Sequence, residues 1–403
     1  MSFKLRYSLT TAATILAVTL LGGGAFADSK MKVLHSFGGT PGDGAGLYGG
    51  LALDPKGNLY GGTSGGGLGG AGIIYQLAPQ RDGTWKESIL RSFGVNDPAG
   101  DSVNSTFVSD ASGNVYGTLE EGGGPATYGT VFKLTPSEKG WAFSVVHRFV
   151  RSGNAGSPKG PLIMDAEGNL YGTADYPFEL SPAGPWPWTF TLLQNSGPGS
   201  NGGLAMDVNH NLYGTTPSGG TGKGCSMGCG TAYELHRDSN GNWDTYVLQD
   251  FYTGDDKLTT PSGVLAVDNK GNLYGIALGG AYKDTVLYEL SPTSAGSWKM
   301  TVLHSFGVGT EGVGGIGGVV FDKAGNMYGM TTAGGDRVCS CGVIYRMTRQ
   351  AHGAWKYTVL HRFTGNDGDQ PEDRLTIDGK GNLYGTTIGG GAFYAGVAFE
   401  FTP

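Results

Sequence analysis

DPKGNLYG, residues 54–61, is the stretch that decides the fold, because it recurs in seven variants along the chain. Successive copies start on average 54 residues apart, a period that indicates one structural unit repeated along the sequence. The other six copies are DASGNVYG from Asp110, DAEGNLYG from Asp165, DVNHNLYG from Asp207, DNKGNLYG from Asp268, DKAGNMYG from Asp322 and DGKGNLYG from Asp378.

The same four short apolar segments surround each copy. The first ends at the Asp, the second begins with NLYG, the third resembles GTVFKLTP at 129–136, and the fourth resembles WKYTVLHRF at 355–363. Alternating apolar positions, β-branched residues and intervening Gly, Pro and Asn are typical of β-strands. Four strands repeated seven times predict an all-β fold, a seven-bladed β-propeller of four-stranded blades.

The two ends of the repeat region complement each other. Residues 32–37, KVLHSF, match the fourth segment with no repeat before them. Residues 396–401, GVAFEF, match the third segment with no fourth after them. We predict that the two segments pair in the last blade and close the ring, which also removes the exposed sheet edges along which β proteins aggregate.

The last repeat carries the residues of a family resemblance. From Tyr384 the chain reads YGTTIGGGAFYAGVAFEF. In this pattern it resembles the GloVer-type tandem repeat of secreted bacterial proteins, and through D-x-x-G-N-x-Y it is distantly similar to NHL-type propeller repeats. The resemblance covers residues 31–403 and implies an exported protein without implying any one activity.

Residues 1–27 have the order of a secretory signal peptide. A basic start precedes the uncharged apolar residues 8–21, and AFA at 25–27 fits a cleavage site of small residues. About 14 apolar residues are too few to cross a bilayer core about 30 Å thick. We expect residues 28–403 to form a single propeller domain that is secreted or periplasmic and free of the membrane after cleavage.

Composition narrows the class of partner. The net charge of −7 and the absence of a basic cluster argue against a nucleic-acid partner. The chain has 76 Gly but also 11% aromatic residues, so Gly-rich turns between packed strands fit better than disorder. We expect a monomer.

Variation between the repeats is concentrated in the loops between second and third strands and in the loops that lead into each blade. In a propeller these loops open on one face, which we call the irregular face, and the D-x-x-G-N turns open on the other, the turn face. Loops of this kind often carry function, although unconstrained drift would look the same. Candidate binding residues in two of these loops are Asp367, Asp369, Glu372 and Asp373, with a smaller pair at Asp255 and Asp256.

The larger acidic cluster offers the oxygen ligands that Ca²⁺ takes from flexible loops. It lacks the spacing of an EF-hand, and solvated loop charge is the alternative interpretation. Apart from Ca²⁺, the sequence points to no cofactor and identifies no metal.

The four cysteines form two close pairs, Cys225 with Cys229 and Cys339 with Cys341. Export favours oxidation, so we predict a disulfide within each pair. The second pair is the harder to link, because a spacing of one residue strains disulfide geometry. A zinc site shared by both pairs would require loops from non-adjacent blades to meet over the axis.

The sequence contains no recognisable catalytic constellation, and enzymatic activity is left open. His35, His147, His304 and His361 share one place in the fourth strand, which favours a structural role. We expect a non-enzymatic binding module whose irregular face meets a glycan, a cell-wall component or a protein. The alternative is an extracellular hydrolase or lyase acting on a saccharide or lactone, which three or four carboxylates or histidines converging at the axial opening would favour.

Overall fold

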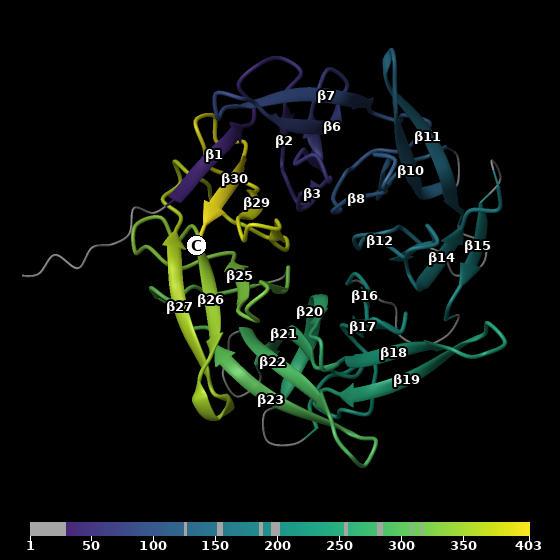
Figure 1. Ribbon diagram of the computed structural model, residues 1–403, viewed down its shortest axis with the longest axis vertical. Helices are drawn as coiled ribbons and strands as arrows, with labels where there is room; N and C mark the ends of the chain where they lie inside the picture. The colour runs from purple at the N-terminus through teal and green to yellow at the C-terminus, as the bar shows by residue number, and fades with distance from the viewer. Residues whose placement is uncertain are drawn as a thin grey trace, which may run out of the picture.

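Seven β-sheets surround a central axis, as the repeats predict (Figure 1). The computed structural model describes residues 30–124, 127–150, 156–184, 188–194, 202–253, 257–279, 285–307, 309–315 and 317–403. The predicted signal peptide, residues 1–27, lies outside these ranges, and no helix within them is long and apolar enough to cross a membrane.

Each blade has four antiparallel strands, which follow chain order from the axis outward in blades 1 to 6, whereas in blade 7 the outer strand is the first strand of the chain. The first blade carries two further two-residue strands. Blade 1 contains β3 (Ala52–Leu53), β4 (Leu59–Gly62), β6 (Gly70–Pro79) and β7 (Trp85–Gly94), with β2 (Gly44–Ala45) and β5 (Gly65–Gly66) beside them. Blade 2 contains β8 (Val108–Ser109), β9 (Val115–Leu119), β10 (Thr127–Ser137) and β11 (Gly140–Val150). Blade 3 contains β12 (Ile163–Met164), β13 (Leu170–Thr173), β14 (Pro177–Ser181) and β15 (Thr189–Leu192).

The remaining blades follow the same plan. Blade 4 contains β16 (Ala205–Met206), β17 (Leu212–Thr216), β18 (Thr231–Arg237) and β19 (Trp243–Asp250). Blade 5 contains β20 (Leu258–Val267), β21 (Leu273–Gly279), β22 (Thr285–Pro292) and β23 (Trp298–Ser305). Blade 6 contains β24 (Val320–Phe321), β25 (Met327–Thr331), β26 (Val343–Arg349) and β27 (Trp355–Arg362), with the 3₁₀ turn η1 (Ala351–Gly353) before β27. Blade 7 contains β28 (Thr376–Ile377), β29 (Leu383–Thr387), β30 (Val397–Thr402) and β1 (Lys30–Ser36).

The predicted seam in blade 7 is confirmed. Strand β1 lies beside β30 at the place where the purple and yellow ends of the chain meet (Figure 1). The pairing is antiparallel, with Lys30 opposite Thr402 and Ser36 opposite Val397. The N–H of Phe37 then donates to the carbonyl of Gly396. The ring therefore closes by hydrogen bonds between the first and last described segments of the chain.

The repeated Asp, Asn and Tyr form one hydrogen-bond network in every blade. In blade 1, Asp54 Oδ1 accepts from the backbone N–H groups of Lys56 and Asn58. Its Oδ2 accepts from the Asn58 amide and from the hydroxyl of Tyr60, at 2.8 and 3.0 Å. Gly57, at φ 85°, occupies the left-handed turn position in the middle, where His210 stands in blade 4 at φ 65°. The motif thus joins the first two strands of each blade through its own side chains.

The same tyrosines pack between blades, which explains why a Trp begins so many fourth strands. Tyr60 meets Trp141 of blade 2 edge-on, with ring centroids 5.7 Å apart. Tyr384 of blade 7 meets Trp85 of blade 1 at 6.2 Å, across the seam. These tyrosines are therefore core residues between blades, and the same holds for Tyr116 with Trp188, Tyr171 with Trp243 and Tyr274 with Trp355.

Candidate functional site

Blade 7 begins differently from the other six blades at the axis. The fifth and fourth residues before the repeated Asp lie just before the innermost strand of each blade, or within it in blade 5. In blade 7 these residues are Asp373 and Arg374, the only charged pair in the set. The other six pairs are Gly49-Gly50, Ser105-Thr106, Gly160-Pro161, Gly202-Gly203, Gly263-Val264 and Gly317-Gly318.

The glycines at this level let neighbouring inner strands touch. A Cβ at Gly202 would lie 2.5 Å from the carbonyl oxygen of Gly263, and one at Gly318 would lie 2.4 Å from that of Val264. Such contacts are too short for any other residue, so the narrow ring at the axis requires glycine there. These glycines are therefore explained by packing and need no ligand.

The opening on the irregular face is lined by all seven blades. It forms a shallow cavity of about 160 Å³. Besides glycines, its wall carries Tyr48, Asn104, Lys159, Glu372 and Asp373. Tyr48 keeps 44% of its surface exposed, and Lys159 is also exposed. The mouth of the channel therefore combines an aromatic ring with groups of both charges.

The carboxylate of Asp373 is fixed by hydrogen bonds from neighbouring residues. Its Oδ2 accepts hydrogen bonds from the Gly50 N–H of blade 1 and, at 2.7 Å, from the Thr106 hydroxyl of blade 2. Its Oδ1 accepts from the N–H of Arg374. With both oxygens accepting hydrogen bonds, this carboxylate links three blades at the axis.

Arg374 lies deeper in the channel. It shares a cavity of about 400 Å³ with the inner strands of blades 4, 5 and 6. The walls there are apolar, among them Met206, Val267, Phe321 and Ile377. The guanidinium makes no hydrogen bond or ion pair with any described residue. Burial lowers the pKa of Arg374, and the charge of Asp373 opposes this only in part.

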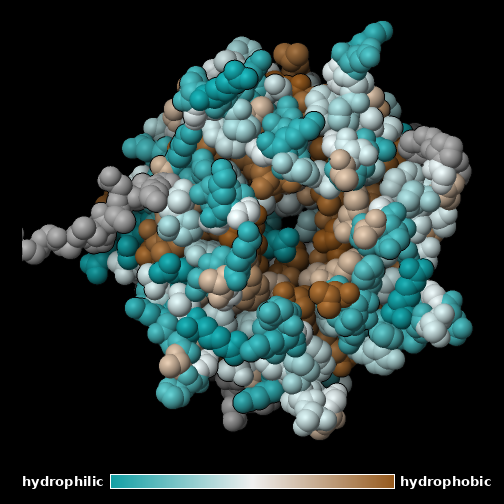
Figure 2. Space-filling model, in the orientation of Figure 1, coloured by the Kyte–Doolittle hydropathy of each residue, from teal (hydrophilic) through white to brown (hydrophobic). Residues whose placement is uncertain are grey.

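Figure 2 shows the central opening bordered by hydrophobic residues, with hydrophilic atoms visible inside it. Further cavities lie on the turn face, between neighbouring D-x-x-G-N turns, and each includes an exposed lysine: Lys270, Lys323 or Lys380. The turn face around the channel therefore carries exposed lysines beside the repeated Asp residues, and Arg374 lies inside the channel.

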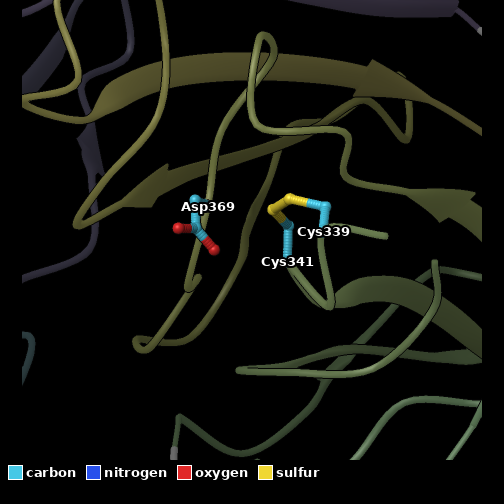
Figure 3. A group of neighbouring side chains, drawn as sticks. All are labelled: Cys339, Cys341 and Asp369. Atoms are coloured by element: carbon cyan, nitrogen blue, oxygen red, sulfur yellow. A yellow bond between two sulfur atoms is a disulfide. The ribbon is translucent and has the colours of Figure 1, made fainter. Parts of the chain in front are cut away.

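The acidic residues expected to bind ligand occupy different places. Asp367 Oδ2 contacts His361 Nε2 at 2.8 Å, and its Oδ1 accepts from the N–H and hydroxyl of Thr364. Burial opposes ionisation of Asp367, yet the hydrogen bonds from His361 and Thr364 hold its pKa below the ordinary value. Asp369 lies beside the sulfur atoms of Cys339 and Cys341 (Figure 3).

Glu372 lies with Asp373 at the channel mouth, apart from the first two. Burial, together with the charge of Asp373, raises the pKa of Glu372. Among the described residues, no three of the four carboxylates come within 4.8 Å of one another. Asp255 and Asp256 lie outside the described residues. Ligand and Ca²⁺ binding by these six residues stay predictions.

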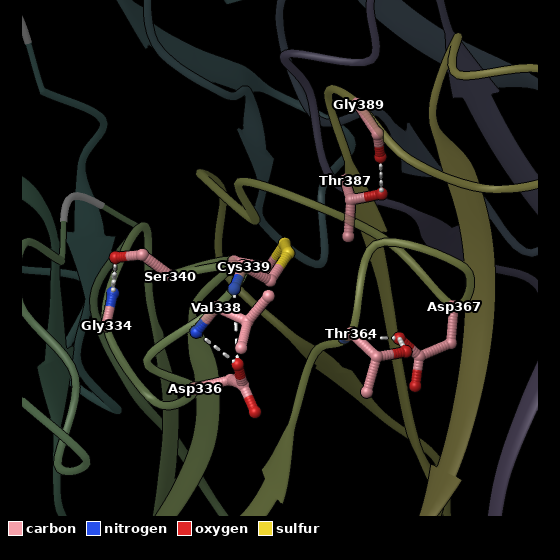
Figure 4. The surroundings of a disulfide bond; sticks show 10 residues. Gly334, Asp336, Val338, Cys339, Ser340, Thr364, Asp367, Thr387 and Gly389 are labelled. Atoms are coloured by element: carbon pink, nitrogen blue, oxygen red, sulfur yellow. Dashed lines mark hydrogen bonds between the residues drawn. A yellow bond between two sulfur atoms is a disulfide. The ribbon is translucent and has the colours of Figure 1, made fainter.

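Both predicted disulfides are present, Cys225–Cys229 and Cys339–Cys341. Hydrogen bonds fix the loop around the second one (Figure 4). Asp336 accepts from the N–H groups of Val338 and Cys339, and the Gly334 N–H donates to Ser340 Oγ at 3.0 Å. Because their sulfurs are bonded to each other, Cys339 and Cys341 are not thiolate ligands beside Asp369.

The mouth differs from the arrangement expected of the enzyme alternative. Its described residues contribute two carboxylates and no histidine, and one of the carboxylates is Asp373, which links blades. The groups of three potential metal ligands in the described chain lie elsewhere. The residue that sequence reasoning missed is Arg374, and the signal for it is its position four residues before a repeated Asp.

Solved structures of other proteins share features of this fold at low sequence identity. A luciferin-regenerating enzyme matches with 16% identity and a TM-score of 0.46, over 74% of this chain and 90% of its own. A gluconolactonase from Xanthomonas campestris matches with 12% identity and a TM-score of 0.42, over 93% and 90%. The extracellular domain of a hybrid two-component system from B. thetaiotaomicron matches with 13% identity and a TM-score of 0.41, over 85% and 38%. None of these similarities bears on the activity of this chain.

Comparison with curated proteins gives no match. The family described as the Gloeobacter/Verrucomicrobia repeat matches residues 22–180 and 221–403, which confirms the resemblance expected from the repeat. This chain belongs to the Gloeobacter/Verrucomicrobia repeat family.

Proposed function

We propose that this protein is an exported binding module that recognises an acidic glycan outside the cell. An anionic group of the glycan enters the axial channel and pairs with Arg374, while the sugar ring occupies the mouth on the irregular face. Export rests on the order of residues 1–27 and on the two disulfides.

The observation that carries the proposal is the lone guanidinium in an apolar channel. Arg374 is only partly exposed, and a charge largely withdrawn from water is costly unless it is paired. Arg374 has no such partner among the described residues. A carboxylate matches a guanidinium through two parallel hydrogen bonds, which the apolar walls would strengthen. In the other six blades the equivalent position holds Gly, Thr, Pro or Val, so the fold itself does not require an arginine there.

The mouth supports a sugar as the carrier of the anion. Tyr48 presents a half-exposed ring on which the apolar face of a sugar can pack. Asn104 donates its amide N–H to Glu120, but its Oδ1 is buried with no hydrogen-bond partner among the described residues. A ligand hydroxyl would satisfy that acceptor, as buried polar atoms generally require. Lys159 supplies a second cation at the same opening.

The test is binding of uronic-acid oligosaccharides, compared with the same oligosaccharides after reduction of the carboxylate to an alcohol. We expect saturable binding of the acidic forms only. Arg374→Thr copies the residue of blade 2 and should weaken binding at least tenfold, about 1.4 kcal/mol. Lys139→Ala removes an exposed cation in the outer turn of blade 2 and controls for net charge.

Equal binding of acidic and neutral forms, or unchanged affinity of Arg374→Thr, would contradict the proposal. The same incubations test the enzyme alternative, because shortened or modified oligosaccharides would appear in them. Glu372 is then the side chain to replace with Gln, since its raised pKa suits a proton donor. Export is tested separately, by N-terminal sequencing of the protein from the culture medium and periplasm, where we expect Asp28 as the first residue.

A further inference from the structure

His35, Asp43 and Glu87 meet at the seam between blade 7 and blade 1. His35 lies on β1, Glu87 on β7, and Asp43 in the loop that joins the two blades just before β2. One ligand atom from each lies within 4.8 Å of the other two. The Asp43 side chain is almost fully buried, with 3% of its surface exposed, and the other two are mostly buried. The seam thus places one imidazole and two carboxylates in a single cluster.

The distances within the cluster are too long for good hydrogen bonds. His35 Nε2 lies 3.4 Å from both oxygens of Asp43 and 3.6 Å from Glu87 Oε2. A charge-assisted bond between these groups would measure about 2.7–2.9 Å. The equivalent pair in blade 6, His361 with Asp367, reaches 2.8 Å. An ion pair alone is therefore a poor description of the seam cluster.

The same distances suit ligands around a tetrahedral metal ion. With Zn–N and Zn–O bonds of about 2.0–2.2 Å, ligand atoms at tetrahedral angles lie roughly 3.3–3.6 Å apart. An imidazole nitrogen together with carboxylate oxygens is a typical donor set for Zn²⁺, whereas Ca²⁺ takes oxygen alone. Three protein ligands leave the fourth position of the tetrahedron to water.

A second observation points to a ligand at this cluster. Glu87 Oε1 is buried and has no hydrogen-bond partner among the described residues. Buried carboxylate oxygens are normally paired, so this one indicates a missing donor or cation. The Asp43 carboxylate, in contrast, is oriented by the N–H groups of Gly39 and Gly44, at 3.2 and 2.8 Å. Such backbone contacts are those that fix metal-ligating carboxylates in place.

The other blades show what this junction looks like without the acidic residues. Blades 1 to 6 share a Trp at or beside the start of the fourth strand. The second residue after it is Glu87 in blade 1 and aromatic in blades 2, 3 and 6. His147 stacks on Phe190 with ring centroids 4.2 Å apart, and His304 stacks on Tyr357 at 4.0 Å. If packing were the only requirement at this junction, an aromatic ring could stand in place of Glu87.

From this arrangement we propose that His35, Asp43 and Glu87 bind one Zn²⁺ ion, which joins the first strand of the chain to blade 1. The site is separate from the axial channel and from the glycan binding proposed there. The ligands come from β1, from the loop between β1 and β2, and from β7. The ion therefore links blade 7 to blade 1 across the seam. Zn²⁺ bound only to the folded ring then stabilises it.

The test uses untagged protein, freed of metal by a chelator and then titrated with Zn²⁺. We expect one Zn²⁺ per chain by calorimetry and by elemental analysis after dialysis, and a higher Tm with Zn²⁺ than without it. Bound Co²⁺ should give the absorption spectrum of a tetrahedral site. Glu87→Gln should weaken Zn²⁺ binding at least tenfold.

Glu87→Phe is the decisive variant, because it copies the aromatic residue of blade 2 and should fold without metal. It should bind no Zn²⁺ at this site, and Zn²⁺ should leave its Tm unchanged. His304→Phe changes a histidine of the same repeat position outside the cluster and should keep full Zn²⁺ binding. Absence of saturable binding to the wild-type protein, or binding by Glu87→Phe equal to that of wild type, would overturn the proposal.

Discussion

Asp373 of the last blade accepts a hydrogen bond from Thr106 of the second blade, 267 positions away in the sequence, at 2.7 Å. The same carboxylate oxygen accepts from Gly50 of blade 1, which lies between them around the ring. One side chain therefore contacts both blades that follow it, at the mouth of the axial channel. This role explains an acidic residue at the channel mouth without invoking a ligand for it.

We predict that Asp373→Ala lowers the free energy of unfolding by about 1–3 kcal/mol, because three donors lose a charged acceptor. Thr106→Val should cost less, and Thr106→Ser, which keeps the hydroxyl, should cost little. Urea unfolding measures all three. The double variant Asp373→Ala with Thr106→Val should lose less than the sum of the single variants, since both remove one interaction. Strict additivity would show that the two residues do not interact.

A second prediction concerns the packing of the segment after β1 against blade 1. Phe37 follows β1, is fully buried, and lies 4.8 Å from the ring of Tyr75 in blade 1. Phe37→Ala should therefore cost roughly 3–5 kcal/mol, the usual range for a buried aromatic residue. Phe393 is 53% exposed near the same blade, and Phe393→Ala should stay within about 0.5 kcal/mol of wild type. Equal, small effects of the two substitutions would mean that β1 does not close the ring in solution.

The repeated Asp gives a prediction about acid stability. Burial opposes ionisation of Asp322, but hydrogen bonds from Asn326, Tyr328 and the backbone N–H of Ala324 hold its pKa below the ordinary value. The unfolded chain thus binds this proton more tightly than the folded one. The stabilisation is complete above the ordinary Asp pKa of about 3.9 and is lost as the pH falls through the lower folded value.

Asp322→Asn keeps the shape and removes the charge, so it should destabilise the protein at pH 7 and flatten the acid limb of its stability curve. Thermal unfolding between pH 2 and 7 measures both effects. Asp244→Asn, an exposed residue on β19, is the control. An acid limb that is as steep in Asp322→Asn as in the wild-type protein would contradict the prediction.

The fold was predictable from sequence because its signal is local. Asp54, Asn58 and Tyr60 lie within seven positions and complete their network inside one blade. The same network recurs seven times, so a single chain shows its period. The seam was also predictable, because residues 32–37 match the fourth segment of the repeat and residues 396–401 match the third, and the two segments pair in blade 7.

The candidate site was not predictable in the same way, because its residues meet only after the ring has closed. The bond between Asp373 and Gly50 joins residues 323 positions apart. In sequence, Asp373 and Glu372 look like further members of the acidic loop that contains Asp367 and Asp369. Ring closure separates them, placing Asp373 at the axis and Asp367 against His361. Arg374 stands out only when the seven repeats are aligned on their Asp and read four residues backward.

The four histidines of the fourth strands also show what position alone leaves undetermined. Their shared position predicts one structural role, and His147 has that role, because burial lowers its pKa to about 4 and so keeps the ring neutral. His35 shares the repeat position but faces Asp43 and Glu87. The residue that decides the difference lies on the neighbouring blade, two positions after its Trp, and is Phe190 for His147 and Glu87 for His35.

The last prediction concerns the effect of His147 on the pH dependence of stability. Its ring is stacked on Phe190 and is kept neutral by burial, whereas in the unfolded chain its pKa returns to about 6.5. Between pH 6.5 and 4 the unfolded state therefore binds more protons, so the stability of the fold decreases as the pH falls through that window. His147→Phe should reduce the pH dependence of the unfolding free energy there and leave the region above pH 7 nearly parallel to wild type. His352→Asn, at an exposed turn, should keep the wild-type slope. If His147→Phe also keeps the wild-type slope of unfolding free energy against pH, the stacked imidazole is not the group that is protonated on unfolding.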